Sequence, residues 1–257
     1  MLGTNQGLQP EPLKMPLLTQ GSAASQSGLD SANEALEQSR LEARLPPLLG
    51  LIAGMVDFNG FFTLGHIFTA HVTGNIVLAT VVAIDGGSFR WAQLSALPVF
   101  MIALATVWLI AQASGRHGSR LARLLLQVQF LVLLMLLIFS VITKPSADPA
   151  GLNADAAATM AVSAMACQYA LLRLALPGAI STAAMTGNLT NAVLSAMDLL
   201  AARNRLLPID STPLSHSLLR LLSFILGCVV AAGAVLLMGD WAWSLPAALA
   251  GIAVALD

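Results

Sequence analysis

The sequence predicts an all-α integral membrane protein. Of its 257 residues, 57% are hydrophobic and 10% are charged, whereas soluble domains carry roughly 25% charged residues. Long uncharged runs recur along the chain, and one polar motif occurs twice, at residues 65–75 and 178–188. These observations favour about six net transmembrane crossings, built from two sequence repeats that each contain a discontinuous or re-entrant Thr-Gly-Asn segment.

Residues 1–45 have the composition of a solvated tail. They are rich in Ser, Gln, Pro, Glu and Arg, and they contain no apolar run of signal-peptide length. Such a composition is typical of disordered segments. A short helix would begin at the capping-box pair Ser31 and Glu34 and end before Pro46-Pro47. We expect a disordered cytoplasmic tail that can be removed, and a helical membrane domain over 46–257.

The first repeat, residues 46–143, begins with a run that is too long for one helix. Asp57 is the single charged residue between Leu45 and Ile84. A helix over that run would be about 60 Å long, twice the roughly 30 Å of a bilayer core. We therefore expect a span up to about Leu64, then a broken segment that carries the polar residues. Two uncharged runs that can each span follow it.

The second repeat, residues 156–257, follows a polar loop and has the same pattern. Its long apolar run, 156–202, carries only Arg173 and Asp198 as charged residues. Two further apolar runs, 221–238 and 241–256, close the chain. The last of these is about 24 Å long as a helix, which is marginal for a span.

The placement of Lys and Arg residues bears on topology. If the motif-bearing segments 46–84 and 156–202 each cross once net, nine basic residues lie inside and two outside. The two repeats then have inverted topology, as in many transporters. The alternative of eight spans puts the cluster Arg116, Arg120 and Arg123 outside and makes the repeats parallel. We prefer six net crossings with both termini cytoplasmic.

Polar residues at membrane depth are usually functional, and the repeated motif supplies most of them. Arg173 lies about one turn from the position equivalent to Asp57, so an Asp57–Arg173 ion pair is expected, with either a structural or a gating role. The two motif asparagines are expected to flank one shared cavity. The candidate pathway or substrate-binding residues are Asp57, Thr69, His71, Thr73, Gly74, Asn75, Gln168, Arg173, Thr182, Thr186, Gly187 and Asn188.

Small residues at a spacing of four mark closely packed membrane helices. Gly50 and Gly54 form one such pair, and Ser223, Gly227 and Ala231 form a second series. We interpret both as helix packing alone. Packing is also the alternative interpretation of the Thr-Gly-Asn triplets.

Several of these motifs resemble those of the YoaK-type bacterial membrane proteins, a family grouped as a domain of unknown function. They are Gly54-x-x-Asp57, the run from Phe68 to Asn75, Gln168, Arg173, and Thr182-x-x-x-Thr186-Gly187-Asn188-Leu189. The family usually has Gly-x-Gln-Asn where this chain has Ala166, Cys167, Gln168 and Tyr169. The resemblance covers about 48–255 and implies a multi-span bacterial inner-membrane protein, but it names no substrate.

The leading hypothesis is a transporter or channel for a small polar or ionic solute, because the repeat symmetry is typical of such proteins. A non-transporting membrane component that binds a lipid or protein partner is the alternative. A membrane-embedded enzyme is disfavoured, because no nucleophile–base pair, metal-ligand spacing or cofactor motif occurs. No catalytic residue, metal or cofactor is therefore expected. The expected partners are the bilayer and an unknown solute, with homo-oligomerisation left open and no nucleic acid.

Overall fold

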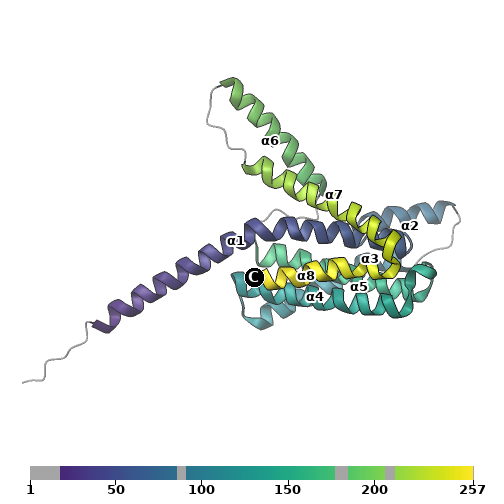
Figure 1. Cartoon of the computed structure of the whole chain (residues 1–257), viewed down its shortest axis with the longest axis horizontal. Helices are drawn as coiled ribbons and strands as arrows, with labels where there is room; N and C mark the ends of the chain where they lie inside the picture. Colours follow the sequence, from purple (N-terminus) through teal and green to yellow (C-terminus); the bar gives the residue numbers. More distant parts are fainter. Residues whose placement is uncertain (1–17, 86–90, 177–184, 206–211, 257) are drawn as a thin grey trace, which may run out of the picture. The chain divides into compact units, whose positions relative to one another are not determined.

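The computed structural model describes residues 18–85, 91–176, 185–205 and 212–256. These residues form α-helices and two short 3₁₀ helices, with no strand among them, so the predicted all-α class is confirmed (Figure 1). The elements are α1 (Leu18–Thr63), α2 (Gly74–Asp85), α3 (Trp91–Ser114), α4 (Gly118–Thr143), η1 (Pro145–Ala147), α5 (Leu152–Leu174), α6 (Met185–Arg205), α7 (Thr212–Met238), η2 (Gly239–Trp243) and α8 (Ser244–Leu256).

Helix α1 runs through Pro46 and Pro47, so the prediction that these prolines end a helix is wrong. A proline inside a helix removes one backbone donor and costs about 3 kcal/mol or more. Here Leu45 and Leu49 on either side are buried in the core, and each such leucine contributes roughly 1.5–3 kcal/mol. The structure also places a helix from Leu18 onward, where composition predicts a disordered tail. Residues 1–37 and 38–257 are separate compact units, and the second holds all that follows.

Helices α1 and α5 contribute much of the core of this second unit. Helix α5 buries a series of alanines, among them Ala157, Ala161 and Ala164. Small side chains let neighbouring helices approach closely, and α5 packs against both α3 and α4, while α4 also packs against α8 (Figure 1). The helices that precede the two Thr-Gly-Asn triplets therefore both lie in the interior.

Helices α1 and α7 meet through the two small-residue series. A Cβ atom on Gly54 would overlap the backbone carbonyl oxygen of Phe224, and one on Gly227 would overlap that of Leu51. Gly50 faces the backbone of Arg220 in the same contact. The interpretation of both series as helix packing is confirmed.

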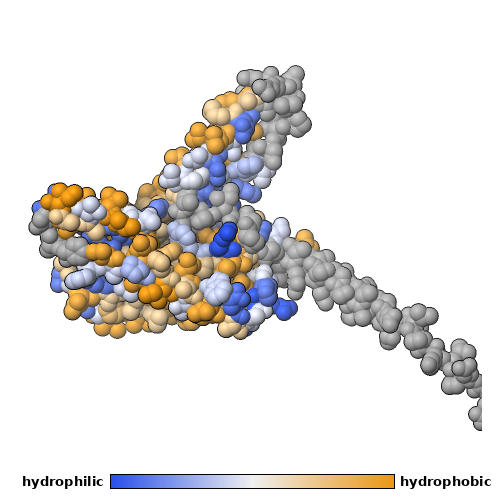
Figure 2. Space-filling model, turned by 180° about the vertical axis from the view of Figure 1, so that it is seen from behind, coloured by the Kyte–Doolittle hydropathy of each residue, from blue (hydrophilic) through white to orange (hydrophobic). Residues whose placement is uncertain are grey.

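Large apolar side chains cover the outside of the helices. Trp108 and Leu109 on α3, Met135 on α4, and Leu236 and Leu237 on α7 are all exposed, and Figure 2 shows hydrophobic residues over much of the visible bundle surface. Soluble monomers rarely expose large contiguous apolar surface. It fits a protein whose outer face contacts lipid.

Five stretches of the described residues are long and apolar enough to cross a membrane. They are Ser39–Thr63, Trp91–Ser114, Gly118–Thr143, Leu152–Leu174 and Thr212–Leu256. The last has 45 residues and contains α7, η2 and α8, so by length it has room for two crossings. Helix α2 is apolar but shorter.

The α1–α7 contact predicts that Gly227→Ala destabilises the protein by about 1–3 kcal/mol, because the added methyl group meets backbone atoms that cannot move independently. Gly233→Ala in the same helix is the control, since no atom lies within 4 Å of the position of its Cβ. That variant should gain up to about 1 kcal/mol from helix propensity. Thermal unfolding of the purified protein in detergent checks both. Equal effects of the two substitutions would show that α1 and α7 do not pack as described.

Candidate functional site

Helix α1 ends in a left-handed turn, and the chain then continues without regular structure until α2. Gly65 and His66 have φ angles of 78° and 64°, a conformation that glycine adopts without strain. The His66 amide donates to the Phe61 carbonyl oxygen at 2.9 Å, which closes the helix end. We call residues 64–73 the α1–α2 segment. Because the segment is not helical, its backbone N–H and C=O groups need hydrogen-bond partners from elsewhere in the protein.

Asp57 of α1 is the partner of two successive backbone N–H groups of the segment. Its Oδ1 accepts the backbone N–H groups of Thr69 at 2.7 Å and Ala70 at 2.8 Å, together with the Thr69 hydroxyl at 3.3 Å. A carboxylate that accepts backbone N–H groups makes charge-assisted bonds that are roughly twice as strong as neutral ones. Asp57 therefore fixes the middle of the segment to the helix that precedes it.

His71 binds the other carboxylate oxygen. Its Nδ1 lies 2.6 Å from Asp57 Oδ2, and the two side chains are 35% and 6% exposed, respectively. The imidazole ring also contacts Phe224 of α7 edge-on, with ring centroids 5.4 Å apart. The pair thus has a buried carboxylate on one side and a partly accessible imidazole on the other.

Asn75, in the first turn of α2, holds the segment from its far end. Its Oδ1 accepts the Phe68 N–H at 2.9 Å and its Nδ2 donates to the Phe68 carbonyl oxygen at 2.7 Å. Both polar groups of one residue in the α1–α2 segment are thereby satisfied. The Asn75 side chain is thereby bonded through both its oxygen and its nitrogen and is buried, so it supports the α1–α2 segment.

Close contacts with glycines of α1 and α2 complete the positioning of the segment. A Cβ atom on Gly60 would lie 2.6 Å from Thr69 Cγ2, and one on Gly74 would lie 3.0 Å from the Phe68 ring. The segment therefore runs back along the last turns of α1, where a larger residue at position 60 would push it away.

Tyr169 of α5 also holds the segment, although it was not among the predicted site residues. Its hydroxyl donates to the Ala70 carbonyl oxygen at 2.7 Å. One feature of the sequence could have identified it: similar sequences usually have asparagine at this position, and this chain has tyrosine. A side chain long enough to reach across from α5 stands at that position.

Gln168, a predicted site residue, forms part of a buried chain between three helices. Gln129 Nε2 of α4 donates to Gln168 Oε1 at 2.8 Å, and Gln168 Nε2 donates to the Leu49 carbonyl oxygen of α1 at 2.9 Å. Gln129 was not expected. Both glutamines are buried, so their contacts hold α1, α4 and α5 together.

The expected Asp57–Arg173 ion pair is absent among the described residues. Asp57 is paired with His71, and Arg173 is exposed near the end of α5. The backbone N–H groups of the α1–α2 segment and a nearby histidine already satisfy the carboxylate. It therefore requires no cation from the other half of the chain.

The second triplet shares the burial pattern of the first. Thr73 and Thr186 are exposed, Gly74 and Gly187 are half-buried, and Asn75 and Asn188 are buried. Thr182 lies outside the described residues. No described contact joins Asn75 to Asn188, so their shared cavity stays a prediction.

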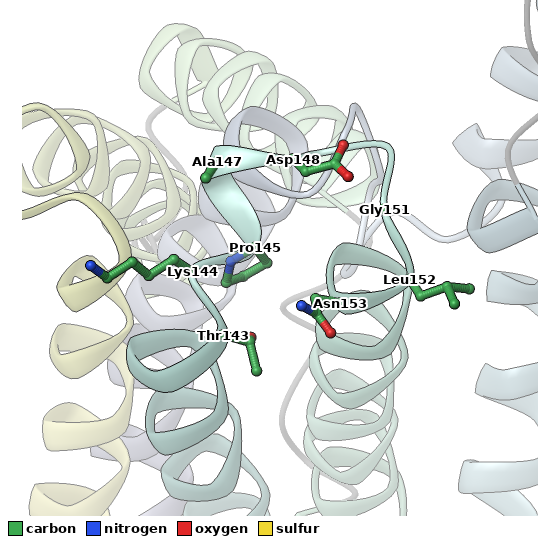
Figure 3. Close-up of a pocket in the computed structure, with 8 residues that line it drawn as sticks. All are labelled: Thr143, Lys144, Pro145, Ala147, Asp148, Gly151, Leu152 and Asn153. Carbon is green, nitrogen blue, oxygen red and sulfur yellow. The ribbon is translucent and has the colours of Figure 1, made fainter.

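One pocket of about 280 Å³ lies between the end of α4 and the start of α5 (Figure 3). The side chains of Lys144 and Asp148 extend away from each other at its rim and do not converge on a common point. No group of three metal-ligating side chains occurs in the part of the chain that the structure describes. The Asp57–His71 pair remains the best-defined polar site.

This geometry predicts thermodynamic coupling between Asp57 and His71. In a double-mutant cycle of Asp57→Asn and His71→Leu, the unfolding free energies should deviate from additivity by about 0.5–3 kcal/mol. The matched cycle with Arg173→Gln should be additive within about 0.5 kcal/mol, since that side chain does not contact Asp57. Denaturant unfolding of the purified protein measures both cycles. Larger coupling to Arg173 than to His71 would contradict the contacts described above.

Comparisons with known proteins agree with the motifs. Residues 46–256 match the family described as "Protein of unknown function (DUF1275)". Over 31 residues the chain is 64% identical to the UPF0700 transmembrane protein YoaK of Bacillus subtilis (strain 168), a match that covers 12% of this chain and 14% of that protein. No solved structure matches. The resemblance to YoaK-type proteins is confirmed, and the chain is a multi-pass membrane protein that belongs to the DUF1275 family.

Proposed function

We propose that this protein is a transporter or channel for a small polar or ionic solute, with its site at the α1–α2 segment. One observation carries the proposal: a buried carboxylate is paired with a partly exposed histidine at a break between two apolar helices. Ionisable residues among membrane helices are costly and usually mark solute or ion pathways. Helix breaks are tolerated there only where protein or a water-filled cavity surrounds them.

The residues of the site divide into supports and accessible groups. Asp57, Thr69, Asn75 and Gln168 are buried and bonded to other parts of the chain. His71 is partly exposed and Thr73 is exposed. We assign solute contact to His71 and Thr73, and the positioning of the segment to the buried residues.

The proposed topology has six net crossings and two inverted repeats in a bacterial inner membrane. The 45-residue apolar stretch Thr212–Leu256 has room for two crossings, which would raise the five candidate stretches to six. The equal burial patterns at the two Thr-Gly-Asn triplets support structurally equivalent segments. Equivalent segments of an inverted repeat meet near mid-membrane. Spin labels at Thr73 and Thr186 separated by more than about 30 Å, a bilayer thickness, would contradict a shared site.

Six net crossings predict that the turn between α3 and α4 faces the cytoplasm. His117 is exposed there, and His117→Cys in a chain without Cys167 and Cys228 provides a labelling site. An impermeant maleimide should label it in inside-out vesicles and leave it unmodified in intact spheroplasts. Labelling in spheroplasts would instead favour eight spans with parallel repeats.

Uptake into proteoliposomes tests the function directly. A panel of ions and small polar metabolites should include a solute that enters only when the protein is present. For that solute, His71→Gln should reduce flux by about tenfold or more, equivalent to about 1.4 kcal/mol. The glutamine amide can still donate to Asp57, as His71 Nδ1 does. It lacks the second nitrogen, Nε2, that the imidazole ring can offer to a solute. His66→Asn is the control, because His66 is exposed and tolerates replacement by a residue suited to its left-handed conformation.

Absence of protein-dependent flux across the whole panel would contradict transport. The non-transporting component that binds a lipid or protein partner would then become the leading function. If His71→Gln shows wild-type flux, the protein is still a transporter or channel, but its solute site does not lie at the α1–α2 segment.

A further inference from the structure

Arg220 of α7 is a buried cation that the proposed solute site does not use. It is 5% exposed and lies on the buried face of α7 with Ser217, Gly227 and Ala231. Its Nη1 has no hydrogen-bond partner, and no ion pair of the described residues includes it. Buried polar groups in native proteins are almost always paired, so this guanidinium needs an explanation.

Among the residues that the structure describes, no carboxylate forms an ion pair with Arg220. The guanidinium stays charged in proteins, and leaving such a charge buried without a partner is strongly destabilising. Among residues packed at the α1–α7 contact, the carboxylate is Asp57, and both of its oxygens are already engaged by the α1–α2 segment. An anion bound from outside the protein would remove the destabilisation caused by this unpaired buried charge.

We propose that Arg220 binds the phosphate group of an anion at the α1–α7 contact. A guanidinium presents two parallel N–H donors that match a phosphate in a bidentate arrangement. Ser217 lies on the same buried face one turn earlier and offers a hydroxyl donor. The site is separate from the Asp57–His71 pair and does not depend on transport.

The position of Arg220 along α7 favours a lipid phosphate as the source. Helix α7 begins at Thr212, so Arg220 lies about 12 Å along its axis. The residues before it include the exposed Thr212, Ser215 and His216, and the uncharged apolar run 221–238 begins directly after it. Such a change from polar to apolar residues marks the membrane–water boundary, where long Arg side chains reach toward the headgroup region. Inorganic phosphate shares the chemistry and is the other source.

Bound phosphate would also stabilise helix packing. The Arg220 backbone faces Gly50 of α1, with 3.3 Å from the Gly50 Cβ position to the Arg220 carbonyl oxygen. A bound phosphate would neutralise the positive charge of Arg220 at the contact between α1 and α7. Binding of phosphate is therefore expected to raise the thermal stability of the whole protein.

The test compares wild type, Arg220→Met and Arg220→Lys as full chains in a neutral, phosphate-free detergent. One arm adds dihexanoyl phosphatidylglycerol, and the other adds inorganic phosphate at constant ionic strength. The lipid should raise the wild-type Tm by at least about 4 °C. The shift should be smaller in Arg220→Lys and lost in Arg220→Met. Arg173→Met, which removes an exposed arginine, should retain the full shift.

The two arms distinguish the sources of the phosphate. A shift with lipid alone identifies a lipid phosphodiester, and a shift with both ligands identifies a site open to free phosphate. Without ligand, Arg220→Met should be at least as stable as wild type, because it removes an unpaired buried charge. The proposal is overturned if neither ligand shifts wild type, or if Arg220→Met keeps the wild-type shift.

Discussion

The hydrogen bonds between the Asp57 carboxylate and the α1–α2 segment are the interaction on which the site depends. Backbone N–H groups that leave a helix inside a membrane must find acceptors within the protein. Asp57 provides one acceptor oxygen to two successive amides and its other oxygen to His71. The carboxylate is in turn satisfied by these donors, so a costly charge and a costly chain break stabilise each other.

This reciprocity explains why the surrounding residues are so constrained. Gly60 leaves room for Thr69, Asn75 binds both backbone groups of Phe68, and Tyr169 binds the Ala70 carbonyl oxygen from α5. These supports come from three helices, and α5 is distant in sequence from the consecutive helices α1 and α2. They leave the imidazole of His71 partly accessible beside the buried carboxylate. A rigid support that holds an accessible ionisable group is a suitable arrangement for a solute site.

The sequence predicted the membrane class and the position of the helix break, because both depend on local composition. The low content of charged residues, the lengths of the apolar runs and the glycine at position 65 can all be read from the sequence without knowledge of tertiary contacts. The partner of Asp57 was not predictable in this way, since it depends on the segment folding back along α1. The continuation of α1 through Pro46-Pro47 depends likewise on the burial of Leu45 and Leu49. Tyr169 and Gln129 act across helices, where residue spacing carries no information.

Amide hydrogen exchange at Thr69 and Ala70 tests the central claim most directly. In the wild-type protein these amides should exchange on the order of a thousandfold more slowly than unprotected amides, equivalent to about 4 kcal/mol. Asp57→Leu removes the acceptor while leaving the position apolar. In this variant the protection at Thr69 and Ala70 should be lost, while amides in the middle of α4 keep theirs. Unchanged protection at Thr69 and Ala70 in Asp57→Leu would contradict the role of the carboxylate.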